Sequence, residues 1–497
     1  MDNIQIVIKG EGTFSLKRGE NVLSVLSEEK QAAISGCGGN GTCGRCAVRF
    51  IMGATMPTAT DRRLFTPAAL REGYRLACMA RPQQNCIVEF CFDDEQIEIV
   101  DRTVFPGEQL DQETAGGQMD SLVLVRVSPS DFGDTMVVVD LGTTTIVMQL
   151  IEINTGRVID TYKTLNPQRR FGADVMSRIT QALMGDDVLL AECVRYCLDG
   201  EIDKWLFAGF SPELIVVACN TTMTYLYNEI DVTELSKAPY SATSLDKIET
   251  DIAHIRTIFL PGLSAFVGGD ITAGLLACMK REAEAESKDS DGDRNVLFVD
   301  LGTNGEMALL KGDRIWATAT SAGPAFEGGA NANTPGTDMI RIIATLLSKG
   351  MIDETGLFRE EYFKNGVSVD GVLIRQEDIR SIQVAKAAVY AGISILCHKA
   401  GIDFEDIDRV YLAGGFGYFL DVESACRIGL LPAKLKDKTV AVGNTALAGA
   451  VEYGLSCRKN PYSDPAEGIR KQAEVINLAE VYEFEEIYIG AMNLAEV

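Results

Sequence analysis

The sequence contains few of the residues and motifs on which several common protein classes depend. Only two of its 497 residues are histidines, His254 and His398, which disfavours metal sites built from several histidines. No run of about eighteen apolar residues occurs, and the first residues, MDNIQIVIKG, lack the layout of a signal peptide. Gly-Lys-Ser/Thr is absent, which excludes a P-loop. We therefore expect a soluble, cytoplasmic protein.

The chain also has far fewer basic than acidic residues. The chain has 46 Lys and Arg against 71 Asp and Glu, a net charge of −25. A surface of this charge repels phosphate backbones and anionic lipids, so we expect neither nucleic acid nor membrane as a partner. The length predicts about three domains, and a hydrophobic content of 46% is sufficient to bury their cores.

Cysteine, in contrast, is abundant, with thirteen residues. In a chain without an export signal this content indicates metal, cluster or redox chemistry and not a disulfide framework. Cys37, Cys43 and Cys46 lie in CGGNGTCGRC, and Cys78 follows in GYRLACMARP. This spacing is close to the plant-type 2Fe-2S pattern, with one additional residue in the first gap. The glycines suit a loop that wraps around a cluster.

Other interpretations of these cysteines are weaker. Structural zinc usually takes two close pairs, and only Cys43 and Cys46 form one here. GNGTCG matches the dinucleotide fingerprint G-x-G-x-x-G, but no helical pattern follows it. Cys86 or Cys91, in NCIVEFCF, is an alternative fourth ligand. We favour Cys78 and expect the other two to be small buried residues of a strand.

The residues around the cysteine loop predict a small β-rich domain. We expect a hairpin from IQIVIK and GTFSLKRG, a short helix in NVLSVLSEE and a closing strand in CIVEFCF. With its four cysteines, the segment 1–93 resembles the 2Fe-2S ferredoxin domain, which implies a β-grasp fold and a one-electron carrier. The polar segment 94–133 is predicted to be a linker.

The remaining chain repeats itself over 134–292 and 293–497. MVVVDLGTTTIVMQLIE and VLFVDLGTNGEMALLKG each contain an apolar strand, an Asp, a Gly-Thr turn and a second strand. ELIVVACNTTM and RVYLAGGFGYF are each a buried strand that enters a turn of small residues. VGGDITAGLLA and VGNTALAGAVE each lead a glycine turn into a helix. Three matched landmarks in the same order predict two similar α/β halves.

The two Asp-x-Gly-Thr turns suit phosphate binding. Their backbone N–H groups and hydroxyls can converge on phosphate oxygens, and the Asp can hold a hydrated Mg²⁺. Together with LAGGFG, the turns resemble the acetate kinase, sugar kinase, Hsp70 and actin superfamily. The implied fold is a multidomain α/β protein, in which the ferredoxin domain and linker precede a duplicated RNase H-like ATPase.

The resemblance implies that ATP with Mg²⁺ binds between the two halves. It assigns a first phosphate loop to Asp140, Gly142, Thr143, Thr144 and Thr145, a second to Asp300, Gly302, Thr303 and Asn304, and the adenosine contact to Gly414 and Gly415. Glu306 lies where an acid can orient the attacking water, although a solvent-facing strand residue fits its position equally well.

Further stretches of the sequence point to one family within this superfamily. NPQRRFGADVMSRI, SAGPAFEGG, QEDIRSIQVAKAAVYAGI and VGNTALAGA, with the ferredoxin domain, resemble the reductive activators of corrinoid-dependent methyltransferases and corrinoid iron-sulfur proteins. The resemblance implies an ATP-hydrolysing reductase that converts Co(II) to Co(I) on a partner corrinoid protein of a methyltransferase system. It also implies a low-potential electron donor such as ferredoxin or flavodoxin. The stretch ANANTPGTDMI departs from the family pattern.

Several alternatives stay open at this point. A sugar or acid kinase is the other enzyme class, and a ferredoxin tethered to a nucleotide sensor is the non-enzymatic one. Asn220 and Asn444 fit either helix caps or ligand contacts, and Lys386 is predicted at the surface. The apolar stripe of SIQVAKAAVYAGISIL fits either the core or a homodimer contact.

Overall fold

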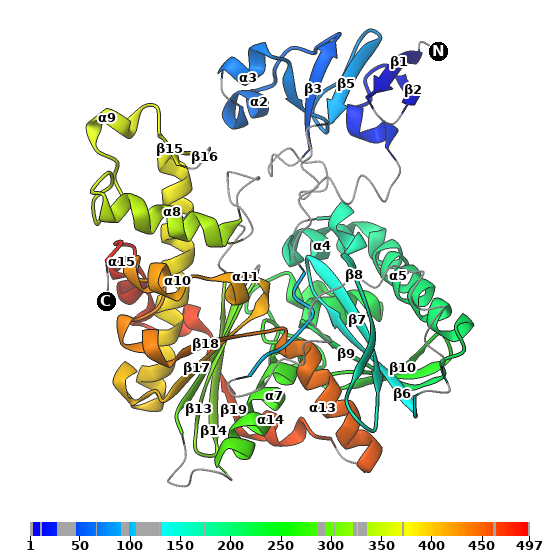
Figure 1. Ribbon diagram of the computed structural model, residues 1–497, viewed down its shortest axis with the longest axis vertical. Coiled ribbons are helices and arrows are strands. Elements are labelled where there is room, and N and C mark those ends of the chain that lie inside the picture. The colour runs from blue at the N-terminus through cyan, green and yellow to red at the C-terminus, as the bar shows by residue number, and fades with distance from the viewer. Residues whose placement is uncertain are drawn as a thin grey trace.

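The structure is a computed structural model. It describes residues 3–9, 12–26, 46–65, 67–90, 99–105, 129, 132–172, 174–286, 294–302, 304–321, 326, 335–369, 372–460 and 464–495. Figure 1 shows a small N-terminal unit and a larger α/β body that contains two sheets.

The described part of the N-terminal unit is a sheet with short helices. It contains the strands β1 (Asn3–Ile8), β2 (Gly12–Lys17), β3 (Ala47–Met52), β4 (Tyr74–Leu76) and β5 (Cys86–Phe90), the 3-10 turn η1 (Val22–Val25), and the helices α2 (Ala59–Leu64) and α3 (Pro67–Arg71). The strand order is β2-β1-β5-β3-β4. The predicted hairpin is confirmed, since β1 and β2 pair antiparallel. Alternate residues of β1 are buried in the core, as a half-buried strand requires.

The first half of the body is built on a mixed sheet. Its elements are β6 (Thr135–Leu141), β7 (Thr145–Glu152), β8 (Val158–Leu165), η4 (Pro167–Arg170), α4 (Val175–Gln181), the π-helical turn η5 (Ala182–Asp186), α5 (Asp187–Phe207), β9 (Pro212–Cys219), α6 (Thr221–Tyr227), η6 (Thr233–Leu235), β10 (Ile248–Ile252), β11 (Ile255–Phe259) and α7 (Gly269–Glu286). The strand order is β10-β11-β9-β6-β7-β8.

The second half has a sheet of the same kind and more helices. Its elements are β12 (Val296–Leu301), β13 (Gly305–Lys311), β14 (Arg314–Thr320), α8 (Gly336–Ser348), α9 (Glu360–Phe363), β15 (Val367–Val369), β16 (Val372–Ile374), α10 (Gln376–Ala400), η8 (Phe404–Asp406), β17 (Arg409–Ala413), α11 (Gly414–Phe419), α12 (Val422–Arg427), η9 (Ala433–Lys438), β18 (Thr439–Gly443), α13 (Thr445–Lys459), α14 (Glu467–Gln472), β19 (Ala473–Val475), η10 (Leu478–Glu480) and α15 (Phe484–Gly490). The strand order is β18-β17-β12-β13-β14-β19.

The predicted duplication agrees with these two sheets. The order β11-β9-β6-β7-β8 corresponds strand by strand to β18-β17-β12-β13-β14. In each half a hairpin of antiparallel strands, β6–β7 or β12–β13, adjoins a parallel neighbour, β9 or β17. Within these two described sheets, the edge strands β10 and β19 have no counterpart, and the second half also contains the separate hairpin β15–β16. The domain bounds themselves stay a prediction.

In each half, the helix that follows the glycine turn packs against the sheet of the other half. Helix α13 packs in one apolar cluster with β6, β7 and β9, through Leu447, Ala450 and Tyr453 among others. Helix α7 packs in a second cluster with β12, β17 and β18, through Ile271, Leu275 and Cys278 among others. The two helices lie side by side between the sheets (Figure 1). This exchange joins the halves through their cores.

Helix α10 is a core helix. By length and hydropathy alone it could span a membrane, but 72% of its most apolar window is buried inside the fold. The core therefore accounts for its apolar stripe, and the homodimer stays a prediction. The surface position expected for Lys386 is wrong: its side chain is fully buried, and its ammonium donates to the backbone carbonyl of Asn493. This carbonyl, from a residue 107 positions further along the chain, stabilises the buried charge. The periodicity of the sequence cannot reveal such a contact.

The first prediction concerns the crossing of α7 and α13. A side-chain carbon added at Gly449 would lie 1.9 Å from the carbonyl oxygen of Ala273, so Gly449→Ala has to push the helices apart. We expect a loss of stability of about 1–3 kcal/mol, measured as a lower thermal midpoint. Gly468→Ala in α14 is the control, because open space surrounds that position. Equal midpoints for both variants would contradict this packing.

Candidate active site

Two carboxylates lie at the ends of the matching central strands. The runs before them, in β6 and β12, are almost entirely buried, as expected for strands covered on both faces. Asp140 and Asp300 are the next-to-last residues of these strands, and each stays partly exposed. The fold therefore brings together the two aspartates that the repeat predicted as equivalent.

Two more acids join them. Asp270 lies in the first turn of α7, and Glu306 stands opposite Asp300 in the antiparallel register of β12 and β13. We call Asp140, Asp270, Asp300 and Glu306 the carboxylate cluster. Its members are close enough to influence one another's ionisation across the junction of the two halves.

Burial and mutual repulsion make the cluster hard to ionise. Burial raises the pKa of Asp140 to about 7, with a smaller effect of Asp270, whereas the hydrogen bond from Asn444 acts in the opposite direction. Burial and then the charges of Asp270 and Asp140 raise the pKa of Asp300 to about 8. Burial and then the charges of Asp270 and Asp300 raise the pKa of Glu306 well above its usual range. A bound cation would relieve this repulsion. Among the described residues no three His, Cys, Asp or Glu side chains lie close enough together to hold one metal ion directly, so the carboxylates fit a hydrated Mg²⁺ that keeps several of its waters.

Three side chains hold the first phosphate loop from behind. The Asn166 amide donates to the carbonyl oxygen of Gly142 at 2.7 Å, and Nη2 of the buried Arg178 donates to that of Thr143 at 2.5 Å. Asn220 donates to Oγ1 of Thr143 at 3.0 Å and also caps α6. With both carbonyls bound from outside, the loop is fixed, and the Arg178 cation makes the potential behind it more positive.

The second phosphate loop is described in part. The Gly302 N–H donates to the Asn304 carbonyl at 2.9 Å, and the Asn304 side chain hydrogen-bonds Glu306. Thr303 lies outside the described residues. In the first loop, Thr144 and Thr145 are partly exposed at the start of β7.

The glycines expected at adenosine border the same centre. Gly414 has a φ of +81°, and a side-chain carbon there would lie 2.4 Å from Oδ1 of Asp300. Only glycine accommodates both conditions. A side chain at Gly415 would meet nothing within 4 Å, which leaves room beside the carboxylate cluster. The adenosine contact stays a prediction.

Sequence reasoning missed Asn166, Arg178 and Asp270, and it did not foresee the bond between Asn444 and Asp140. Asn444 caps α13, which confirms one of its two alternatives, and donates to Oδ2 of Asp140 at 2.7 Å, whereas a contact with ligand stays a prediction. The signal for Asp270 and Asn444 is the repeat itself, since both belong to the glycine turns that precede α7 and α13. For Asn166 and Arg178 the signal is the stretch NPQRRFGADVMSRI.

The cysteine site of the N-terminal unit is partly described. Cys46 and Cys78 are both buried, and their sulfurs lie 3.2 Å apart. Two thiols at this separation fit a shared 2Fe-2S cluster. Cys37, Cys43 and Cys91 lie outside the described residues. Cys86 is a buried residue of β5, and burial raises the pKa of its thiol to about 11, as in an inert core cysteine.

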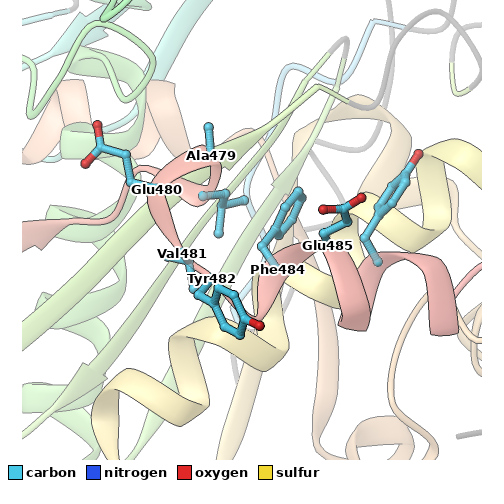
Figure 2. A pocket seen from close by; sticks show the side chains of 8 residues that line it. Ala479, Glu480, Val481, Tyr482, Phe484 and Glu485 are labelled. Carbon is cyan, nitrogen blue, oxygen red and sulfur yellow. The ribbon is translucent and has the colours of Figure 1, made fainter.

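A separate pocket lies at the C-terminal segment. It has a volume of about 510 Å³ and is lined by residues 478–482, Phe484, Glu485 and Tyr488 (Figure 2). No member of the carboxylate cluster lines this pocket. It therefore takes no part in the site described above.

Comparison with known families agrees with this architecture. A family model for the 2Fe-2S iron-sulfur cluster binding domain matches residues 6–83. A model described as the RACo middle region matches residues 135–282, and one described as the C-terminal, ASKHA domain of RACo matches 294–334 and 332–497. The chain belongs to the RACo family. The ASKHA assignment confirms the superfamily that the two Asp-x-Gly-Thr turns predicted.

Two relatives carry descriptions of activity. The chain is 31% identical over 394 residues to the corrinoid activation enzyme RamQ of Eubacterium limosum, a match that covers 64% of the chain and 63% of RamQ. It is 24% identical over 435 residues to the [Co(II) methylated amine-specific corrinoid protein] reductase of Methanosarcina barkeri, covering 72% and 76%.

One solved structure resembles the whole chain. The match, to a reductive activator for a corrinoid, iron-sulfur protein, has a TM-score of 0.59 at 24% identity and covers 99% of this chain and 98% of the other. It supports the fold and the order of the domains.

A pH-dependent stability follows from Asp300. Folding raises its pKa from 3.8 to about 8, so the folded protein binds a proton that the unfolded chain releases, and stability falls as pH rises between these values. Asp300→Asn should therefore raise the thermal midpoint of the ligand-free protein at pH 8 and less so at pH 5. Asp313→Asn, in the exposed turn between β13 and β14, is the control. A lower midpoint for Asp300→Asn at pH 8 would contradict the repulsion.

The cysteine assignment predicts opposite effects at two buried positions. Cys78→Ser should remove most of the visible 2Fe-2S absorption per chain, because it removes a ligand from the Cys46 pair. Cys86→Ser should leave that absorption unchanged. Spectra of anaerobically purified variants with iron and sulfide analysis test both. Loss of the cluster in Cys86→Ser with retention in Cys78→Ser would reassign the fourth ligand.

Proposed function

We propose that this chain is an ATP-driven reductase that returns an inactive Co(II) corrinoid protein to Co(I). One observation carries the proposal: a single chain combines a buried thiol pair in a 2Fe-2S domain with a carboxylate cluster at the junction of two ASKHA sheets. The names of the two relatives, a corrinoid activation enzyme and a Co(II) corrinoid protein reductase, support the choice of substrate.

The nucleotide side of the proposal rests on the two loops. The loop 142–145, held by Asn166 and Arg178, offers its backbone N–H groups and hydroxyls to phosphate oxygens. Asp140 and Asp300 hold Mg²⁺, which supplies the positive charge that neutralises the phosphates. Glu306 orients the attacking water, and the products are ADP, phosphate and a proton.

The reduction of each Co(II) ion to Co(I) requires one electron. A low-potential donor such as ferredoxin or flavodoxin gives up one electron, and Co(II) on the partner accepts it to become Co(I). Cys37, Cys43, Cys46 and Cys78 hold the 2Fe-2S cluster, which supplies one-electron storage between the two. The cobalt belongs to the partner, and the reaction takes place in the cytoplasm.

The helix exchange supports a coupling between the two sides. Helices α7 and α13 begin at the glycine turns beside the carboxylate cluster, and each packs on the opposite sheet. A nucleotide that contacts both aspartates favours the closed arrangement of the halves, and its hydrolysis releases that arrangement.

The proposal predicts ATP-dependent formation of Co(I). Full-length protein with its cluster, a strong reductant and MgATP should reduce a Co(II) corrinoid protein, followed by the absorption of Co(I). Asp140→Asn should lower the rate about 100-fold or more, because it removes a charge that binds Mg²⁺ and the phosphates. Asp313→Asn, exposed and distant from the carboxylate cluster, should retain the wild-type rate.

Two results would contradict the proposal. Reduction that proceeds at the same rate without ATP would remove the need for the ASKHA domain. Transfer of phosphate to a sugar or carboxylate, with no effect of corrinoid protein on ATP turnover, would favour a kinase.

A further inference from the structure

Residues 99–105, within the predicted linker, pack against the second half; we call them the strap. The Val104 N–H donates to the carbonyl of Val442 at 2.9 Å, and Thr103 forms a β-bridge with Gly443. Phe105 is buried in the cluster of α7 and β18, and its ring meets Tyr411 edge-on at 5.5 Å. The strap therefore lies along the edge strand β18, to which it is joined by one isolated β-bridge, and its Phe105 ring is part of the apolar cluster below.

The strap is also bound to the first half. The Gln149 side chain, on β7, donates to the carbonyl of Asp101 at 2.6 Å. Lys163, on β8, pairs with the Asp101 carboxylate at 2.8 Å and donates to the carbonyl of Ile99 at 3.3 Å. The same seven residues thus join strands of both halves.

Asn444 connects the strap to the carboxylate cluster. Its side-chain nitrogen donates to Oδ2 of Asp140 at 2.7 Å and to the carbonyl of Val100 at 3.1 Å. Its backbone N–H donates to the carbonyl of Arg102 at 3.0 Å, and its own carbonyl accepts from the Thr103 hydroxyl at 2.5 Å. Each of these bonds joins Asn444 to the strap or to Asp140, and the residue is 7% exposed.

The neighbouring backbone is shaped for this contact. Gly443 has a φ of +85°, and a side-chain carbon there would lie 2.2 Å from the carbonyl oxygen of Arg102. The turn before α13 thus admits the strap only because residue 443 is glycine.

We propose that Asn444 is a positioning residue for Asp140 and that the strap holds Asn444, so that nucleotide bound at Asp140 tightens the strap. Because the strap follows the ferredoxin domain in the chain, this contact connects the nucleotide site to the segment that carries the electron carrier. The inference rests on the ATP-binding part of the proposed function and does not require the corrinoid partner.

Nucleotide affinity in the full-length holoprotein tests the positioning role. Asn444→Ser keeps an oxygen that can cap α13 but loses the amide donor to Asp140 and Val100. We expect its Kd for Mg·AMP-PNP to rise about tenfold, the size of one charge-assisted hydrogen bond. Thr103→Val, which loses only the hydroxyl to Asn444, should raise the Kd about two- to fivefold. Asp421→Ala, which removes the cap of α12, should not change it.

Hydrogen exchange of the backbone tests the strap itself. Mg·AMP-PNP should slow exchange at 99–105 in the wild-type protein, and this slowing should be lost in Asn444→Ser at saturating nucleotide. Wild-type affinity in Asn444→Ser would overturn the inference. So would protection of the loop 142–145 without any change in the strap. If neither the loop nor the strap responds to nucleotide, the proposed function fails as well, whereas absent cobalt reduction alone leaves this inference standing.

Discussion

The repulsion among Asp140, Asp270, Asp300 and Glu306 is the constraint around which the rest of the structure is organised. Burial raises the pKa values of all four acids, and neighbouring charges add to this effect for Asp140, Asp300 and Glu306, so the ligand-free centre opposes its own ionisation. The surrounding fold has to supply the stability that the centre lacks. It does so with buried strands on both sides and with two helices that begin at the cluster. A bound cation with its phosphates would replace the repulsion between the carboxylates by attraction to the cation. The free energy of this binding would then be available to move the two halves.

The exchange of α7 and α13 limits what that movement can be. Each helix buries apolar surface on the sheet of the opposite half, and Gly449 packs directly on the backbone of Ala273. Full separation of the halves would expose both clusters to water at a large free-energy cost. Closure therefore has to consist of small rotations about this crossing, which closely packed helices tolerate by shear.

The features that the sequence alone predicted are those set by residues close together along the chain. Buried strands, the Asp-x-Gly-Thr turns and the spacing of the cysteines are local patterns. The structure has Asp140 and Asp300 on corresponding strands and Cys46 beside Cys78, as these patterns led us to expect, and their roles stay predictions. Contacts between distant residues left no such pattern. Asn444 lies 304 residues from Asp140 in the sequence. Arg178 donates to a backbone carbonyl, and because every residue has one, the sequence gives no sign of this partner. Lys386 was misjudged for the same reason, because its partner is the carbonyl of Asn493.

The strap also changes how far the electron carrier can travel. A free linker over 94–133 would let the ferredoxin domain range widely, but the strap fixes the chain again at Ile99. Eight residues separate Phe90, the end of β5, from Ile99, and a fully extended chain of that length reaches about 30 Å. The end of β5 therefore stays within that distance of Ile99, which keeps the N-terminal unit near the strap at a high effective concentration.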